Sequence, residues 1–333
     1  MISTVMTFII VFGILVFVHE SGHFLVAKLN GVYVHEFALG MGPTIFSWQG
    51  KETKYALRLL PIGGFVRMEG EDEQSDNPRS FSQKTPLQRL SIIVAGPVMN
   101  FILAFIALTI VILAIGMPVN TVGGFSEDSP AMEAGLEVGD RIVQIGDLPI
   151  DSWNDVVNAI SGTDALQLQI TVIRDQEELT YTTNLTEDPE TGRKLIGISR
   201  GVERNPGKAI QSAFVGIITL IGMILNFLGS LFTGGADMAQ VSGPVGIYSA
   251  VSQASKAGWI SVLEITALLS VNLGLFNLLP IPALDGGRLI FIIVELFRGK
   301  PVDPDKEGFV HFVGFVLLMA LMVMLVFKDL QAL

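Results

Sequence analysis

Four long runs of apolar residues decide what this chain can fold into. They cover roughly residues 5–27, 92–115, 262–279 and 309–327. A helix of about 20 predominantly apolar residues is what crosses the hydrocarbon core of a bilayer. The composition agrees, because 50% of the 333 residues are hydrophobic and 16% are charged, against about 25% charged in soluble domains. The sequence therefore predicts a polytopic α-helical membrane protein with about four transmembrane helices.

The segment between the second and third runs has a different character. Residues 118–205 are charged and rich in turn residues. Their patterning predicts strands over 141–145 and 166–173 and a short helix over 153–160. We therefore expect one inserted α+β domain here, which interrupts the membrane domain.

The membrane domain is then made of two parts, residues 1–117 and residues 206–333. Within the second part, residues 209–232 are apolar but interrupted by glycines. This stretch fits either a further span or a helix lying in the membrane interface. The first run has no Lys or Arg before it and no small-residue cleavage pattern after it, so we expect it to be a retained helix rather than a signal peptide.

Charge predicts how the chain is oriented. Lysines and arginines are numerous between the first and second runs and between the third and fourth, and such loops favour the cytoplasmic side. Both termini and the inserted domain are then expected on the other side of the cell membrane. The net charge of −11 argues against nucleic acid as a partner. With no cysteine in the chain, a metal site must use His, Asp and Glu.

The first apolar run contains a metal-binding pattern. His19, Glu20 and His23 form His-Glu-x-x-His. Residues four apart lie on one face of a helix, so both imidazoles can bind one ion, while Glu20 can take a proton from water bound there. Ionisable groups inside a span are costly and mark functional sites by default. Zinc suits such ligands.

A catalytic zinc site needs a third protein ligand. The candidate is Asp285, which follows Pro280 and Pro282 at the end of the third run. The prolines bar a regular helix there, and irregular backbone at membrane depth must be buried in protein or line a cavity. The alternative is that Asp285 caps the next helix. Asn277, in the same run, could donate to a developing oxyanion or simply bond to another helix.

Together these motifs resemble the site-2 protease family of intramembrane metalloproteases, and most closely its bacterial regulator-of-sigma-E protease group. The resemblance covers nearly the whole chain. It rests on residues 17–24 (FVHESGHF), 63–66 (GGFV), 95–100 (AGPVMN), 242–246 (SGPVG) and 277–286 (NLLPIPALDG).

The resemblance implies a role for each matching residue. His19, His23 and Asp285 would hold one zinc ion per chain, Glu20 would be the general base, and Asn277 would steady the substrate or the oxyanion. Gly63, Gly64, Phe65 and Val66 would belong to a membrane-dipping β-hairpin that pairs with unwound substrate.

The inserted domain resembles a PDZ domain of the permuted bacterial type. The matching residues are 123–131 (GGFSEDSPA) and 134–142 (AGLEVGDRI). The family implies partners that are single-span membrane proteins, of the anti-sigma-factor or remnant-signal-peptide type. It also implies a multi-pass place in the bacterial inner membrane, with the PDZ-like domain extracytoplasmic.

Two other functions compete with proteolysis. A membrane-anchored PDZ module with a dead metal site would be a binding protein, although an intact Glu20 disfavours it. A transporter would also have broken helices with carboxylates at mid-depth, but no inverted repeat of the spans is apparent.

Overall fold

The structure is a computed structural model that describes residues 2–71, 73, 75–187, 192–235 and 241–331. The chain forms two compact units, which we treat separately. The membrane unit contains residues 1–111 and 212–333, and the inserted unit contains residues 112–211.

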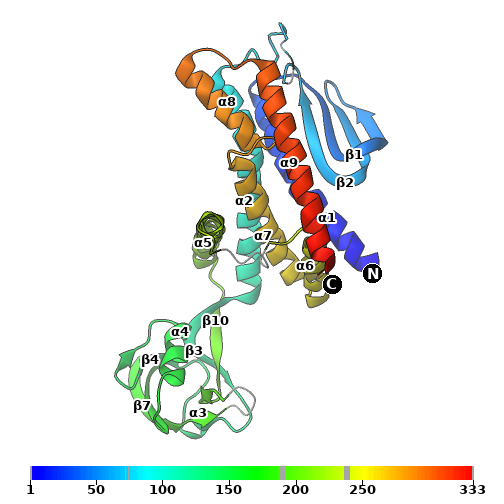
Figure 1. Cartoon of the computed structure of the whole chain (residues 1–333). Coiled ribbons are helices and arrows are strands. Elements are labelled where there is room, and N and C mark those ends of the chain that lie inside the picture. The colour runs from blue at the N-terminus through cyan, green and yellow to red at the C-terminus, as the bar shows by residue number, and fades with distance from the viewer. Residues whose placement is uncertain (1, 72, 74, 188–191, 236–240, 332–333) are drawn as a thin grey trace. The chain divides into compact units, whose positions relative to one another are not determined.

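The membrane unit is mainly helical (Figure 1). Its elements are α1 (Ile2–Leu29), β1 (Val34–Gln49), β2 (Lys54–Met68), α2 (Pro86–Ile115), α5 (Pro206–Thr233), α6 (Pro244–Ala257), α7 (Trp259–Leu278), α8 (Asp285–Arg298) and α9 (Pro304–Gln331). Among the described residues, α1, α2, α5, α7 and α9 are long and apolar enough to cross a membrane. The predicted class, a polytopic helical membrane protein, is confirmed. The helix beyond the expected four is α5.

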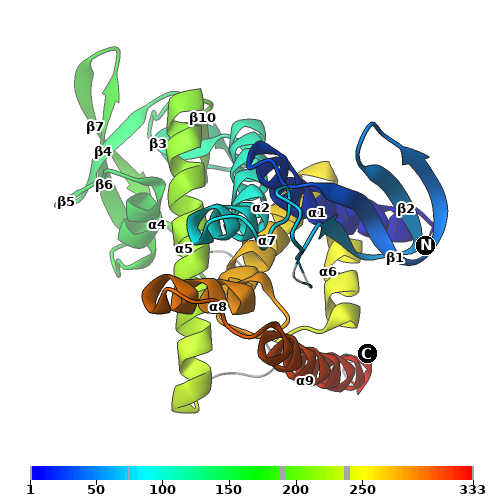
Figure 2. The same cartoon turned by 90° about the horizontal axis from the view of Figure 1, so that it is seen from above.

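The direction of α5 differs from that of the helices it packs on. Figure 1 shows α5 end-on while α2 and α7 run lengthwise, and the turned view of Figure 2 shows α5 lengthwise. Ile217 of α5 is buried in one apolar cluster with Ala104 and Ala107 of α2 and with Ala267 and Val271 of α7. Beyond Ser212, α5 therefore lies crosswise against α2 and α7.

Strands β1 and β2 are both bent, so that their halves form a small antiparallel sheet. The first half of β1 pairs with residues 54–57 of β2 on one side and with residues 64–68 on the other, while the second half of β1 pairs with the first half of β2. Gly40 and Gly42 provide the bend in β1, with φ of +86° and +83°. Residues 64–68 are therefore an edge of this sheet in the described part of the chain.

Apolar side chains cover the bent half of this sheet. Seven of them are exposed: Met41, Ile45, Phe46, Trp48, Leu57, Leu59 and Leu60. An exposed apolar patch of this kind marks a surface that meets lipid or protein.

The inserted unit is built on one antiparallel sheet. Its elements are β3 (Met117–Phe125), α3 (Pro130–Glu133), β4 (Arg141–Ile145), β5 (Leu148–Pro149), α4 (Trp153–Ser161), β6 (Gln167–Arg174), β7 (Glu177–Asn184), β8 (Thr186–Glu187), β9 (Lys194–Leu195) and β10 (Ile198–Glu203). The strand order is β10-β3-β4-β6-β7, with β5 beside β4. Ser152 and Asp155 form a capping box at the start of α4. The helix and strands predicted from the sequence match α4, β4 and β6.

A buried ion pair ties β6 to the turn before β4. The side chain of Asp140 is 1% exposed and accepts hydrogen bonds from Arg174 Nε at 2.7 Å and Nη2 at 2.8 Å, and from the Glu137 amide at 2.9 Å. Burial alone would raise the pKa of Asp140, but the hydrogen bonds from Arg174 and Glu137 outweigh it and hold that pKa below its ordinary value.

Arg174→Leu should therefore destabilise the inserted unit by about 3–5 kcal/mol, because it leaves a buried charge without its partner. The pair stabilises the fold above the unfolded pKa of Asp140, about 3.9, and its contribution is lost as the pH falls through the lower folded value. Amide hydrogen exchange of β4 and β6 in the full chain measures the effect near neutral pH. Arg141→Leu, at an exposed arginine of β4, is the control, and equal exchange rates in the two variants would contradict the prediction.

Candidate metal centre

The two histidines of the His-Glu-x-x-His pattern lie one turn apart on α1 and both point to the start of α8. Their Nε2 atoms are 3.2 Å apart. Asp285 Oδ2 lies 3.2 Å from His19 Nε2 and 3.4 Å from His23 Nε2. Residues more than 260 positions apart in the sequence thus meet at one point, as the third-ligand prediction required.

Helix α2 fixes the orientation of both imidazole rings. His23 Nδ1 lies 2.9 Å from the backbone oxygen of Ile92. A carbonyl oxygen only accepts, so Nδ1 carries the proton and Nε2 keeps its lone pair. His19 Nδ1 lies 3.0 Å from the side-chain amide of Asn100, which is fully buried. With the amide nitrogen toward His19, Asn100 Oδ1 has no hydrogen-bond partner among the residues that the structure describes.

If the Asn100 amide is rotated by 180°, both imidazoles carry their proton on Nδ1 and keep a lone pair on Nε2. The nitrogen and oxygen of an amide are nearly equal in size, so the hydrogen-bond network decides which of them faces His19. With Oδ1 toward His19, it accepts the Nδ1 proton, and His19 Nε2 is then free to donate its lone pair. Outer partners of this kind commonly orient histidine ligands of metals.

The geometry of the three atoms fits a zinc ion. Two imidazole lone pairs and a carboxylate oxygen facing one another repel unless a cation lies among them. Zinc bonds of about 2.0–2.1 Å at tetrahedral angles place neighbouring ligand atoms about 3.3 Å apart. The three separations here are 3.2, 3.2 and 3.4 Å. Three protein ligands also leave the fourth position that a catalytic zinc site requires.

Small residues let α1 and α2 approach closely enough to form this centre. A Cβ atom on Gly22 would lie 2.3 Å from the backbone oxygen of Ala95, and one on Gly96 would lie 2.3 Å from His23 Nε2. Such contacts between small residues are a common way for helices to pack in membranes. The backbones of α1 and α2 therefore meet directly beside the metal ligands.

The centre opens into a cavity of about 470 Å³. Its lining includes the three ligands and Glu20, together with Gly64, Phe65, Val66, Arg67, Met68, Glu71, Ile93, Ala283, Leu284 and Arg288. All five residues of the sheet edge 64–68 thus line the same cavity as the candidate base. A Cβ atom on Gly64 would lie 3.0 Å from Glu20 Cγ.

Two predicted site residues lie elsewhere. Asn277 is half-buried on α7, does not line this cavity, and donates its Nδ2–H to the backbone oxygen of Leu273 at 3.0 Å. Gly63 is also outside the lining, and its φ of +74° makes it the bend that leads into the edge strand. The role expected for Asn277 stays a prediction.

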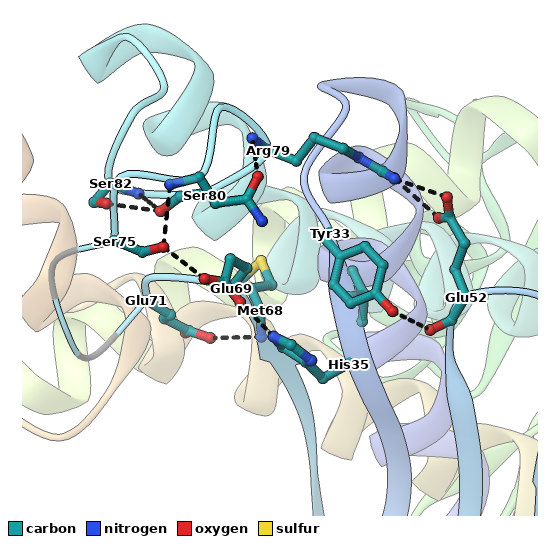
Figure 3. Close-up of polar contacts among 12 residues, drawn as sticks. Tyr33, His35, Glu52, Met68, Glu69, Glu71, Ser75, Arg79, Ser80 and Ser82 are labelled. Atoms are coloured by element: carbon teal, nitrogen blue, oxygen red, sulfur yellow. Dashed lines mark hydrogen bonds and ion pairs between the residues drawn. The ribbon is translucent and has the colours of Figure 1, made fainter.

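A polar loop between β2 and α2 is held by the side-chain contacts that Figure 3 shows. Glu69 bonds to His35 Nε2 and accepts from Ser75 Oγ, both at 2.6 Å. Glu71 forms an ion pair with Arg288 of α8, and both residues line the cavity. The loop therefore links the sheet to the helix that carries Asp285.

A cluster of charges anchors the same loop to the hairpin turn (Figure 3). Glu52 accepts from Arg79 Nη1 and Nη2 at 2.8 and 2.9 Å and from Lys28 Nζ at 2.8 Å. These hydrogen bonds, from Arg79 first and then Lys28, lower the pKa of Glu52 to about 2. Glu52 therefore stays ionised, and the cluster persists, at any physiological pH.

The chain is similar along nearly its whole length to proteins named as zinc metalloproteases. A protein of Clostridium acetobutylicum named as a zinc metalloprotease is 41% identical over 330 residues, covering 96% of this chain and 95% of that protein. The zinc metalloprotease RasP of Bacillus licheniformis is 36% identical, covering 99% of each chain. The regulator of sigma-W protease RasP of Bacillus subtilis is 34% identical, covering 100% of this chain and 99% of its own.

One solved structure and one family model also match part or most of the chain. The PDZ domain of an SdrC-like protein from Listeria innocua matches 26% of this chain and 97% of its own, with 26% identity and a TM-score of 0.23. The sequence model of peptidase family M50 matches residues 7–321. With His19, Glu20, His23 and Asp285 gathered at one point, this chain belongs to peptidase family M50 and is a membrane-embedded metalloendopeptidase.

Proposed function

We propose that the chain is an intramembrane protease that hydrolyses peptide bonds in or near the transmembrane segments of single-span proteins. The observation that carries this proposal is the convergence of His19, His23 and Asp285 beside Glu20. The same cavity contains Glu20, which can transfer a proton, and the edge strand 64–68, which can hold a peptide.

We assign the chemistry as follows. The three ligands would hold one zinc ion, which when bound polarises the scissile carbonyl and lowers the pKa of water to about 7. Glu20 takes a proton from the attacking water and passes it to the leaving amide nitrogen. Asn277 could steady the oxyanion only if its amide leaves the oxygen of Leu273, with which it bonds at 3.0 Å.

Residues 64–68 are proposed to bind the substrate by strand addition. A transmembrane helix satisfies all its backbone groups internally, so a scissile bond is exposed only after local unwinding. A free sheet edge satisfies the released N–H and C=O groups. With the edge beside Glu20, an added strand would lie next to the base.

Glu20→Gln tests the enzymatic proposal. It removes the proton acceptor while leaving all three ligands, so cleavage of a single-span substrate should fall about 10²- to 10⁴-fold with zinc content unchanged. Glu178→Gln, at an exposed residue of β7, is the matched control. Undiminished cleavage by Glu20→Gln would sink the assignment.

The same Glu20→Gln protein tests strand addition, because it should bind substrate without cutting it. Alternate amides of residues 64–68 should exchange more slowly with solvent when a single-span substrate is added. No change in their exchange would remove the edge strand from the substrate site.

We further propose the bacterial inner membrane as the location, with residues 118–205 forming an extracytoplasmic PDZ-like domain between the membrane parts 1–117 and 206–333. If the crosswise helix α5 lies along the membrane, four spans remain and both termini face the same side as that domain. Substrates of the anti-sigma-factor or remnant-signal-peptide type fit this arrangement, and a relative is named as a regulator of sigma-W protease. Protease accessibility of residues 118–205 in oriented vesicles tests the orientation; digestion from the cytoplasmic side would contradict it.

A further inference from the structure

The loop that delivers Asp285 to the centre has an unusual backbone. Ala283 has a φ of +72°, in the left-handed region that a residue with a Cβ atom rarely adopts. Pro280 and Pro282 have no amide hydrogen to contribute. The amides of Ile281 and Leu284 bond within the loop, to the oxygens of Leu279 and Ile281. The strained Ala283 takes its amide partner from outside the loop, and such a conformation persists only where its surroundings stabilise it.

Helix α9 contributes the missing contact. The Ala283 amide donates to His311 Nδ1 at 2.9 Å. Because Nδ1 accepts, the proton of the neutral ring is on Nε2. Glu307, one turn earlier on α9, has its Oε1 3.9 Å from that Nε2, which favours this tautomer.

The surrounding packing brings α9 close to the loop at this point. A Cβ atom on Gly314, three residues after His311, would lie 2.4 Å from Pro282 Cβ, and one on Gly287 would lie 3.1 Å from His311 Cε1. Elsewhere α9 is largely exposed. Its contact with the loop is thus local and close, and it is centred on the residues that flank Ala283.

We propose that His311 is a positioning residue for the metal ligand Asp285, an inference that rests on the metal centre of the proposed function. By accepting from the Ala283 amide, His311 holds the left-handed turn two residues before Asp285. That turn sets the direction from which the carboxylate enters the centre. His311 does not itself line the cavity that contains the metal ligands.

The test compares two variants of similar size in the full chain. In His311→Asn, the side-chain oxygen occupies the position of Nδ1 and can still accept from Ala283. In His311→Leu, a methyl group occupies that position and cannot accept. Zinc affinity is measured by competition with a chelator, and the visible spectrum of the cobalt-loaded chain reports the ligand geometry.

We expect His311→Leu to alter the cobalt spectrum and to bind zinc more weakly, by about 10-fold, the lower end of the effect of losing a direct outer partner of a metal ligand, because His311 acts through the backbone of Ala283. His311→Asn should restore both. The Ala283 amide should exchange slowly in the parent chain and in His311→Asn, and rapidly in His311→Leu, even before metal is added.

Two results would overturn the inference while the proposed function stands. One is a His311→Leu chain that binds metal with the parent affinity and spectrum. The other is a His311→Asn chain that fails as badly as His311→Leu, because the hydrogen bond would then not be what matters. A parent chain that binds no metal at all would instead defeat the proposed function, and the role of His311 with it.

Discussion

A chain with Gly96→Ala is expected to lose its metal and, with it, all measurable proteolysis. The added Cβ atom would lie 2.3 Å from His23 Nε2 and 2.6 Å from Cε1, far inside van der Waals contact. The ring cannot simply rotate away, because the backbone oxygen of Ile92 holds its Nδ1 at 2.9 Å. His23 must therefore leave the position in which its Nε2 faces Asp285.

Gly22→Ala should have the same result for a different reason. Its Cβ atom would meet the backbone of α2, at 2.3 Å from the oxygen of Ala95, so the two helices must move apart. Gly13→Ala on α1 is the control, because its Cβ atom would meet nothing within 4 Å. Zinc per purified chain and cleavage of a single-span substrate are the measurements. A Gly96→Ala chain with one full equivalent of zinc would show that the two helices do not pack in this way.

Removal of the carboxylate ligand is the second large effect expected. Asp285→Ala leaves two imidazoles and no carboxylate among the ligands. Loss of an outer partner alone weakens metal binding about 10- to 100-fold, so loss of a direct ligand should weaken zinc binding by more than about 100-fold. Cleavage should fall to background at zinc concentrations that saturate the parent chain.

Asp285→Asn separates charge from size in this experiment. The amide has nearly the shape of the carboxylate but is a weaker ligand, so its affinity should also fall far below that of the parent. Asp305→Asn, at an exposed carboxylate near the start of α9, controls for a general change in charge. If Asp285→Ala bound zinc as well as the parent, Asp285 would not be a metal ligand. The alternative that Asp285 caps the next helix does not hold, because the N-cap of α8 is Leu284 and no side chain caps it.

The helices and the two histidine ligands could be predicted from the sequence because each depends on local information. The length of an apolar run predicts a spanning helix, and a spacing of four residues places His19 and His23 on one face. The prediction of Asp285 as the third ligand depended on more features, namely two prolines and a carboxylate at the end of a span. These features do not depend on how the helices rotate against each other.

The contacts around the ligands do depend on that rotation. Helix α1 is apolar on every side, so periodicity could not indicate which face meets α2. Asn100 is a polar residue in an apolar run, but nothing in the sequence predicts its contact with His19, or the contact of His311 with Ala283. The same uncertainty applies to Asn277, whose amide bonds within its own helix instead of facing the cavity.

The length of the sheet edge also determines how much of a substrate would have to unwind. Its apolar bend and its charged turn around Glu52 lie at opposite ends, and residues 64–68 run from one toward the other. If the bend meets lipid, residues 64–68 lead from the membrane interior toward water. At about 3.4 Å per residue, these five residues extend about 17 Å. Glu20 lies beside Gly64, at the end of this edge that is nearest the apolar bend. If a substrate pairs along this edge, about five residues of its helix have to unwind on the aqueous side of the scissile bond. Clients whose helices fray easily at the membrane surface would then be cut fastest.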